Sequence, residues 1–360
     1  MTPYGSNETS PPIPHPPKVS ILIVNYNGAQ WLENCLNSLL QTSYPNREII
    51  VVDNNSTDHS LHLLQNYPTV HTVQSPTNLG FAGGNNLGLN HCSGEFILLL
   101  NNDTTVTPNF LEPLVHYLTQ NPQVGIAQSK MLLPRFNHTL DVCGSFLTSF
   151  GFPYHVGYYK PDGPAYSKPY PVFSAKGACM ILRRSILPLT GNFLFDDSFF
   201  CYYEETDLCH RAWLAGIETH FVPQSVIHHL HGATGGQPNR AGFVLQLYLR
   251  NQLFSLLSNL STPALLKILP LYSLLFLTST LAALITLRIP LLKAHTHALT
   301  HCWKNRASIR NRRHLARQIR TIPDKQLLPR ILRNPRFSYF WRSFTGSLSR
   351  YTDDPTSFTQ

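Results

Sequence analysis

The chain of 360 residues is predicted to have an α/β fold: a doubly wound, mostly parallel sheet, followed by C-terminal hydrophobic and basic helices. Two observations predict the sheet. Short apolar runs alternate with stretches of helical patterning over the first hundred residues, which is typical of βαβ units. The run FILLL at 96–100 is entirely apolar, as expected for a strand buried on both faces of a parallel sheet.

The elements of this sheet follow one another along the N-terminal part of the chain. Strands are expected at 19–24, 48–53, 69–74 and 96–100, with helices at 28–41, 57–67 and 80–91. After Pro134 the pattern gives way to a stretch rich in glycine, tyrosine and proline that runs to Pro171, which we interpret as a mobile flap. Regular structure is expected to resume with a strand within 175–185 and a helix that ends at Gly216.

The two ends of the chain differ from its middle in composition. The first seventeen residues are rich in proline and lack the apolar stretch of a signal peptide, so 1–17 is expected to be a disordered lead-in. One large domain is expected at 18–245, a membrane-associated helical segment at 246–292, and a basic tail at 293–360. The seven cysteines include no CxxC pair, which argues against a disulfide framework or a structural zinc site and favours a reducing compartment.

An uncharged stretch of twenty residues, ILPLYSLLFLTSTLAALITL at 268–287, is long enough to span a bilayer. The region from 293 to 350 contains fourteen Lys or Arg residues and one acidic residue. A single span would place this basic tail and the preceding domain on opposite sides of the membrane, against the positive-inside tendency. We therefore favour a helix that lies in the interface or re-enters the membrane, with the tail on anionic headgroups. A spanning helix and a buried core helix are the alternatives.

Polar residues follow two of the predicted strands directly. Asn101, Asn102 and Asp103 come after the fourth strand, and Asp53 ends the second. Ligands bind at the carboxyl ends of strands in open α/β sheets, although an Asx turn would also explain such residues. The turn after the first strand has a single glycine, so the Gly-rich turn of a dinucleotide site is missing. These observations favour a mononucleotide, with Asp53 accepting from the base or the ribose.

A glycine-rich stretch, PTNLGFAGGNNLG at 76–88, spans the start of the third predicted helix. Glycines near the start of a helix allow backbone N–H groups to approach a phosphate or a sugar closely. Together with the strand ends, this stretch gives the expected nucleotide-binding residues: Asn25, Tyr26, Asn27, Asp53, Asn55, Asn78, Gly80, Asn85 and Asn102.

Five motifs occur in an order and spacing that resemble those of family 2 glycosyltransferases. They are VSILIVNYNGAQWLENCLNSLL, EIIVVDNNSTD, NLGFAGGNNLG, FILLLNNDT and FCYYEETDLCHRAWLAG. The resemblance covers about 18–234 and does not extend beyond about residue 260. It implies a GT-A fold for the domain at 18–245, and the rhamnosyltransferase-like members are the most similar subgroup.

The resemblance implies metal-binding roles for Asp103, which follows the fourth strand, and for His229 further along the chain. Asp103 matches the last acid of the DxD motif, which places a divalent cation on the diphosphate of a nucleotide sugar, so Mg²⁺ or Mn²⁺ is the expected cofactor. Asn101 takes the place of the first acid, and because its amide brings no charge we expect it to contact the donor sugar. His229, in a His-x-x-Gly-x-Thr pattern with Gly232 and Thr234, is expected to complete the metal site or to contact the diphosphate. A loop histidine without a role is the alternative.

The segment YYEETDLCHR places three acidic residues at the start of a predicted helix. Acidic side chains there also stabilise the helix dipole, and Asp207 can pair with Arg211 one turn later. An inverting transferase needs a base that removes the proton of the acceptor hydroxyl. In the similar family the matching pair is usually Glu-Asp with the second residue as the base. This implies Glu205 here, with Glu204 as the reserve and Asp207 as a donor or acceptor contact.

One further residue, Gly177 in AKGACM, resembles a glycine that the family has beside the acceptor cleft, although close packing also explains it. The expected function is that of an inverting glycosyltransferase at the cytoplasmic face of a membrane. It moves a sugar, with rhamnose as the candidate, from a dTDP- or UDP-sugar to a hydroxyl group of a lipid-linked or polysaccharide acceptor. A nucleotide-sugar-binding module without turnover and a polyprenyl-phosphate sugar synthase are the alternatives. Nucleic acid is not an expected partner, because the aromatic residues of the tail cluster at its end.

Overall fold

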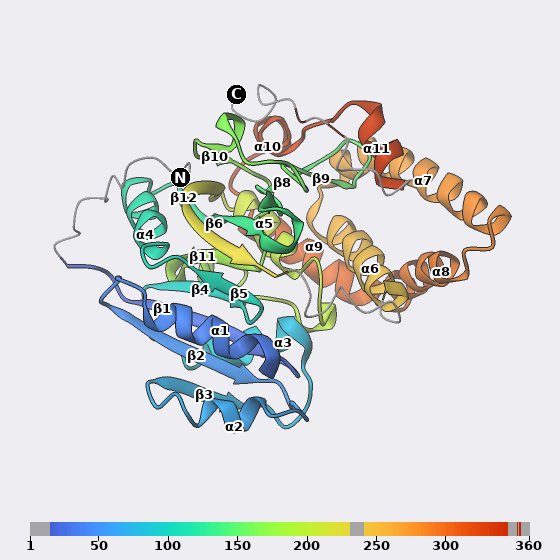
Figure 1. Ribbon diagram of the computed structural model, residues 1–360. Helices are drawn as coiled ribbons and strands as arrows, with labels where there is room; N and C mark the ends of the chain where they lie inside the picture. The colour runs from blue at the N-terminus through green and yellow to red at the C-terminus, as the bar shows by residue number, and fades with distance from the viewer. Residues whose placement is uncertain (1–14, 231–240, 345–350, 352, 354–360) are drawn as a thin grey trace.

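The computed structural model describes residues 15–230, 241–344, 351 and 353, so residues 1–14 of the expected lead-in, and also Gly232 and Thr234, lie outside the described part. Within it, ten strands form one mixed sheet with helices on both faces (Figure 1). In spatial order the main path of the sheet is β10 (Tyr170–Pro171), β12 (Glu218–His229), β6 (Val124–Leu133), β11 (Cys179–Arg183), β4 (Phe96–Asn101), β1 (Val19–Asn25), β2 (Arg47–Asp53) and β3 (Val70–Gln74). The strand β5 (Thr104–Val106) pairs with β12, and β7 (Thr139–Leu140) pairs with β6.

The carboxyl ends of the central strands lie at one edge of the sheet. β1 pairs in parallel with β2 and β4, which sets Asn25 opposite Asp53 and Val24 opposite Asn101. β2 also pairs in parallel with β3, which confirms the doubly wound arrangement predicted for this half of the sheet. β11 runs antiparallel to both β4 and β6, so the other half of the sheet is mixed.

Successive residues of the strands enter two different hydrophobic cores. Helices α1 (Ala29–Leu40), α2 (Ser60–Leu64) and α4 (Leu111–Gln120) cover one face of the sheet, and α3 (Gly80–Leu89) and α5 (Glu204–Leu214) cover the other. Ile21 and Ile23 of β1 belong to the first core, and Leu22 between them belongs to the second. Side chains of a strand alternate between faces, so a sheet that is covered on both sides needs the uninterrupted apolar runs found in β1 and β4.

Two helix boundaries show how local sequence sets the elements. α2 begins later than predicted, because Asp58 accepts a hydrogen bond from the backbone N–H of Ser60 (3.0 Å) and so forms a turn before the helix. Gly216 follows the last turn of α5 as predicted, with a φ of +77°. The N–H of Ile217 reaches back to the carbonyl of Ala212 (2.9 Å), which is the long hydrogen bond of a Schellman motif.

The stretch before Pro171, interpreted from the sequence as a mobile flap, is packed into the body of the protein. It contains β7, β8 (Ser145–Leu147) and β9 (Pro153–His155) before β10. Phe146 and Tyr154 are buried there in a hydrophobic cluster with Tyr170. The hydroxyl of Tyr154 also donates to the carboxylate of Asp353 (2.5 Å), far away in the sequence. The aromatic side chains of this stretch thus form a small core with residues of β6 and β12, among them Leu132 and Phe221.

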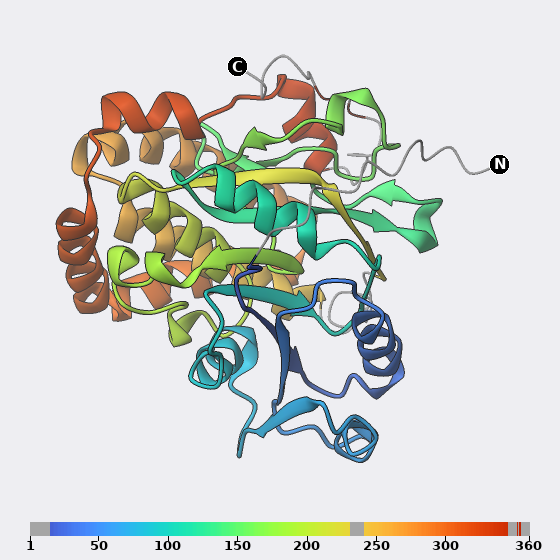
Figure 2. The same cartoon turned by 90° about the vertical axis from the view of Figure 1, so that its left-hand side faces the viewer.

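The C-terminal part of the chain is helical and lies away from the N-terminal strands, as the orange and red ribbons of Figures 1 and 2 show. The helices are α6 (Ala241–Asn259), α7 (Thr262–Ile285), α8 (Ile289–Lys304), α9 (Arg306–Ile319), α10 (Asp324–Ile331) and α11 (Phe337–Phe344). α6 is one continuous helix, so it crosses the division predicted at 245. Phe254 of α6 and Ala316 of α9 share a core with Trp213 of α5. The segment predicted as a basic tail therefore includes helices that belong to the folded body.

α7 is the one helix among the described residues that is long and apolar enough to cross a membrane. Only 22% of its most apolar stretch is buried, and Leu274, Leu277 and Leu281 are each more than half exposed. α7 packs against α8, and the two helices extend to the right-hand edge of the protein in Figure 1. The alternative of a buried core helix does not fit this exposure.

Candidate active site

A cavity of about 690 Å³ lies at the carboxyl ends of β1 and β4, a size that is typical of small-molecule sites. Helix α5 begins at the same cavity, so the strand ends and the first turn of α5 face one space. The residues expected from the sequence that line it are Tyr26, Asn78, Gly80, Asn101, Asn102, Asp103, Gly177, Glu204, Glu205 and His229. The expected residues that do not line it are Asn25, Asn27, Asp53, Asn55, Asn85 and Asp207.

Asn25 and Asp53 form a buried pair next to the cavity. The Nδ2 of Asn25 donates to Oδ1 of Asp53 (3.3 Å), and Oδ1 of Asn25 accepts from Nδ2 of Asn102 (2.7 Å). The second carboxylate oxygen of Asp53 accepts from the backbone N–H of Ser56 (3.0 Å). The pair thus supports Asn102, which does line the cavity, and shapes the turn after β2.

Three other asparagines have local roles. Asn27 and Asn55 have positive φ values of 51° and 65°, a conformation that asparagine tolerates better than most residues. The Oδ1 of Asn27 accepts from the backbone N–H of Thr57 (2.7 Å), which joins the turns after β1 and β2. Asn85 donates to the carbonyl of Phe81 in its own helix (2.8 Å). The side chains of Asn27 and Asn85 are thus engaged within the protein and Asn55 is exposed, so none of the three lies in the lining of the site, where they were expected.

Asn54, which we did not single out from the sequence, lines the cavity and holds the glycine-rich stretch. Its Nδ2 donates to Oδ1 of Asn78 (3.0 Å) and to the carbonyl of Gly80 (2.9 Å), while its Oδ1 accepts from the N–H of Leu79 (2.9 Å). Gly80 has a φ of +71°, and a Cβ there would lie 2.3 Å from the carbonyl oxygen of Phe200. The stretch is therefore fixed between the end of β2 and the segment that leads into α5.

Three side chains form a chain of polar contacts beside the end of β4. The pairing of β5 with β12 sets His229 opposite Thr104. The Nε2 of His229 lies 3.3 Å from Oδ1 of Asp103, and its Nδ1 lies 2.8 Å from Oδ2 of Asp141, a residue that the sequence did not indicate. Burial alone would lower the pKa of His229, but the hydrogen bonds with the two carboxylates outweigh it and raise the pKa to about 10.

Glu204 and Glu205, the first two residues of α5, are both buried in the cavity wall. Burial first, and then the charge of Glu205, raise the pKa of Glu204 well above its ordinary value. The Oε1 of Glu205 lies 3.9 Å from Nζ of Lys176, which also lines the cavity and was not singled out from the sequence. A Cβ at Gly177 would lie 3.2 Å from the Phe81 ring, so this glycine permits close packing in the wall of the site.

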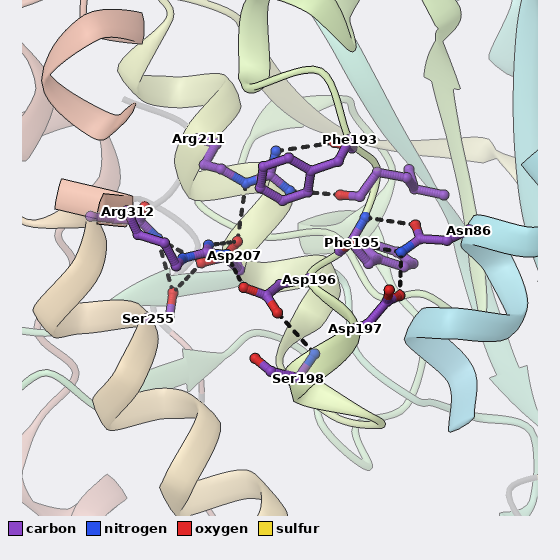
Figure 3. A network of polar contacts seen from close by, with 12 residues as sticks. Asn86, Phe193, Phe195, Asp196, Asp197, Ser198, Asp207, Arg211, Ser255 and Arg312 are labelled. Carbon is purple, nitrogen blue, oxygen red and sulfur yellow. Dashed lines mark hydrogen bonds and ion pairs between the residues drawn. The ribbon is translucent and has the colours of Figure 1, made fainter. Parts of the chain in front are cut away.

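Asp207 lies elsewhere, in the buried network of Figure 3. The pair with Arg211 is confirmed, with 3.0 Å between Nε of Arg211 and Oδ2 of Asp207. Burial would raise the pKa of Asp207, but the charges of Arg312 and Arg211 outweigh it and hold the pKa below its ordinary range. Its place as a donor or acceptor contact is thereby corrected, because the side chain does not reach the cavity.

The arrangement of the sheet and the position of the cavity define a protein with the GT-A fold of glycosyltransferases. The mannosyltransferase PcManGT from Pyrobaculum calidifontis, solved in complex with GDP-Man and Mn²⁺, aligns with a TM-score of 0.54 and 17% identity, over 93% of this chain and 86% of its own. TarS of S. aureus, residues 1–349, aligns with a TM-score of 0.51 and 16% identity, over 84% of this chain and 88% of its own. At these identities the likeness shows the fold alone.

Residues 20–187 match the family model described as Glycosyl transferase family 2, and this part of the chain belongs to that family. The O-antigen biosynthesis protein RfbC of Myxococcus xanthus is 32% identical over 231 residues, which are 61% of this chain and 18% of that protein. The low-salt glycan biosynthesis hexosyltransferase Agl10 of Haloferax volcanii is 29% identical over 203 residues, which are 54% of this chain and 61% of that protein. The chain thus matches less than two thirds of the length of either relative. The family match also ends before Glu204, so α5 lies beyond it.

Proposed function

We propose that the protein is an inverting glycosyltransferase that moves a sugar, with rhamnose as the candidate, from a dTDP- or UDP-sugar to a hydroxyl group of a lipid-linked or polysaccharide acceptor. The observation that carries this proposal is that Asp103 and His229 line the same cavity as Glu204 and Glu205. The reaction needs both kinds of group, one set for the leaving diphosphate and one for the attacking hydroxyl. The names of the two curated relatives, which refer to O-antigen and glycan biosynthesis, support an acceptor of this kind.

The residues at the end of β4 fit a divalent cation, Mg²⁺ or Mn²⁺. Asp103 offers a hard oxygen ligand, and Nε2 of His229, which lies 3.3 Å from Oδ1 of Asp103, would be a second ligand once the imidazole has lost its proton. Asp141 holds the other nitrogen of His229, as carboxylates commonly do behind metal-binding histidines. Among the described residues, no group of three or more His, Cys, Asp or Glu is arranged to hold a metal ion, so the diphosphate itself is expected to supply ligands. A cation bound here would neutralise charge on the leaving diphosphate.

The donor is proposed to lie across the strand ends. The base and ribose are assigned to the side of Asn78 and of Tyr26, a residue that is 40% exposed. Asn101 lies at the cavity beside Asp103 and offers an amide to the hydroxyl groups of the sugar. In this proposal the sugar lies between the diphosphate site and the start of α5.

Glu205 is assigned as the base. In the reaction, the acceptor oxygen bonds to the anomeric carbon while the bond to the diphosphate breaks on the opposite face, and the electron pair leaves with the diphosphate. The Glu205 carboxylate takes the proton of the acceptor hydroxyl. Lys176 is ion-paired with it and helps to orient it. Glu204 retains its proton to a higher pH than an ordinary glutamate, so its hydroxyl is available as a hydrogen-bond donor.

The membrane part of the proposal rests on α7 and its turn to α8. Leu277, Leu281, Leu284 and Leu287 are between 53% and 76% exposed, and the neighbouring Arg288 is exposed as well. An apolar surface bordered by basic side chains suits the interface of a membrane with anionic headgroups. We propose that this surface holds the enzyme at the cytoplasmic face, close to a lipid-linked acceptor.

A donor screen followed by a transfer assay tests the function. Thermal unfolding of the full chain is measured with dTDP-, UDP- and GDP-sugars in the presence of Mn²⁺ or Mg²⁺, because a ligand that binds only the folded state raises the melting temperature. We expect one dTDP- or UDP-sugar to give the largest shift and to be consumed when a sugar acceptor is added. Donor binding without consumption would favour a binding module. Transfer to a bare polyprenyl phosphate would identify a polyprenyl-phosphate sugar synthase.

A further inference from the structure

We propose that Arg312 of α9 is a positioning residue for sugar transfer: through Asp207 it holds the first turn of α5, which carries Glu204 and Glu205. The inference rests on the proposed glycosyltransferase function. Arg312 is not part of the lining of the cavity, so it acts only through the residues that it contacts. It also lies far outside the part of the chain that matches the family model.

Asp207 is the centre of a buried network that joins three helices (Figure 3). Its Oδ2 accepts from Nε of Arg211 (3.0 Å) in α5 and from Nη2 of Arg312 (2.6 Å) in α9. Its Oδ1 accepts from the hydroxyl of Ser255 (2.9 Å) and from Nδ2 of Asn259 (2.7 Å), both in α6. Two guanidinium groups and two neutral donors therefore converge on one carboxylate, which is 1% exposed.

The guanidinium group of Arg312 is also bound by a second carboxylate besides that of Asp207. Its guanidinium also pairs with the carboxylate of Asp196, whose Oδ1 accepts from the backbone N–H of Ser198 (2.8 Å). The side chain is buried, whereas Arg306 and Arg310 of the same helix are exposed. The planar fork of a guanidinium can engage two carboxylates in fixed directions. A buried arginine in an otherwise exposed basic helix thus links α9 to α5 and to the loop before α5.

The N-terminus of α5 is not stabilised by a side-chain cap. Tyr203, which precedes the helix, has a φ of 74° and makes no capping hydrogen bond through its side chain. Phe200 and Tyr202 have φ values of 61° and 70°, which are unfavourable for aromatic residues. Asn251 of α6 holds this segment by donating to three of its carbonyl oxygens. Side chains of α6 and α9 therefore help to fix the position of the two glutamates.

Asp207 lies close enough to Glu204 along α5 for the network to affect the position of the glutamates. Asp207 follows Glu204 by three residues, about one helical turn, so a shift of Asp207 carries the first turn of α5 with it. A displacement of about 1 Å at a catalytic group can lower a rate about 100-fold. The ion pairs of Arg312 are with Asp196 and Asp207, and neither of these residues lines the cavity with the donor residues at the ends of β1 and β4. Loss of the Arg312 contact is therefore expected to lower kcat and to leave donor binding in place.

The test compares two neighbouring arginines of α9. Arg312→Lys keeps the charge and loses the fork that joins Asp207 and Asp196. Arg313→Lys is the control, because the Arg313 guanidinium bonds to the carbonyls of Leu257 and Leu260 and does not contact Asp207. We expect Arg312→Lys to lower kcat at least about 10-fold and to shift the pH profile of kcat, with the donor dissociation constant from calorimetry unchanged within about twofold. Arg313→Lys is expected to keep the wild-type values.

The outcomes separate the inference from the function on which it rests. A folded Arg312→Lys protein with the kcat and pH profile of Arg313→Lys would overturn it, as would equal losses of kcat and donor binding. If Arg312→Lys does not fold, Ser255→Ala, which removes a neutral donor to Asp207, is expected to show the same split between kcat and donor binding with a smaller loss. A wild-type kcat in that variant would then overturn the inference. A wild-type protein that transfers no sugar from any nucleotide donor would remove the proposed function, and the inference with it.

Discussion

Glu204 and Glu205 are consecutive residues of one helix, yet their carboxyl groups have different surroundings. The Oε2 of Glu204 is buried without a hydrogen-bond partner among the described residues, whereas Oε1 of Glu205 lies 3.9 Å from Nζ of Lys176. Burial and the charge of Glu205 raise the pKa of Glu204. The carboxyl group of Glu204 thus holds a proton more tightly than that of an ordinary glutamate, and Glu205 has a basic neighbour, as expected where two neighbouring acids have different roles.

The raised pKa of Glu204 predicts that stability depends on pH. A carboxyl group whose pKa is higher in the folded state contributes stability that is fully present below the ordinary value of 4.5 and is lost as the pH rises through the folded-state pKa. Glu204→Gln is neutral at every pH and has no such loss. We expect the free energy of unfolding of the wild type to fall relative to that of Glu204→Gln as the pH rises from 4.5, measured by urea unfolding. A difference that is constant with pH, or that matches the exposed control Glu33→Gln, would contradict this prediction.

The contact between Asp141 and His229 predicts a role for Asp141 in metal affinity. Asp141→Asn keeps the shape of the side chain and removes the charge that orients the imidazole. We expect the affinity for Mn²⁺, measured by calorimetry with nucleoside diphosphate present, to fall roughly 10- to 100-fold. Asp162→Asn is the control, because Asp162 pairs with Lys130 (2.8 Å) and does not line the cavity. Equal affinities in the two variants would show that Asp141 does not support the metal site.

The close approach of Gly80 to the segment before α5 predicts a steric effect. A Cβ at Gly80 would lie 2.3 Å from the carbonyl oxygen of Phe200, and the φ of +71° is unfavourable for alanine. We expect Gly80→Ala to lower the free energy of unfolding by more than about 1 kcal/mol. Gly163→Ala is the matched control, because no heavy atom lies within 4 Å of a Cβ at Gly163. Similar urea midpoints for the two variants would argue against the packing described for this loop.

The exposed face of α7 predicts binding to anionic vesicles. We expect the wild-type protein to float with vesicles that contain anionic lipid, and the double variant Leu277→Glu, Leu281→Glu to remain in solution, because both leucines are more than half exposed. Leu40→Glu on α1, which is 44% exposed, is the control and should float like the wild type. Equal flotation of the double variant would exclude this face as the membrane contact.

The parallel half of the sheet could be predicted because its signals are local. Each strand is a short apolar run, and the polar residues at 101–103 follow the fourth strand at once. Parallel pairing then brings the strand ends together without further information, which is why Asp103 could be expected at the edge of the sheet where it lines the cavity. The start of α5 was found for a similar reason, since its acidic residues stand together in one motif.

The remaining part of the site depends on contacts between distant segments. Asp141 and His155 come from the stretch before Pro171, where the aromatic residues have no regular spacing, and both line the cavity only because that stretch packs against the sheet. Lys176 belongs to a segment predicted as a strand, where a lysine is expected to be a surface residue. Arg312 is one of many basic residues in its segment, and only its burial against Asp207 distinguishes it. Conversely, Asp53 and Asn55 stand in a motif that also builds the turn after β2.

The most direct measurement is the rate of sugar transfer by Glu205→Gln and Glu204→Gln beside the wild type, with Mn²⁺ and a saturating donor. We predict that Glu205→Gln lowers kcat by roughly 10²- to 10⁴-fold with the donor still bound, because the acceptor hydroxyl then loses its proton acceptor. Glu204→Gln should cost far less, since glutamine resembles the protonated carboxyl group that it replaces. Wild-type turnover in Glu205→Gln, or a larger loss in Glu204→Gln than in Glu205→Gln, would contradict the assignment of the base.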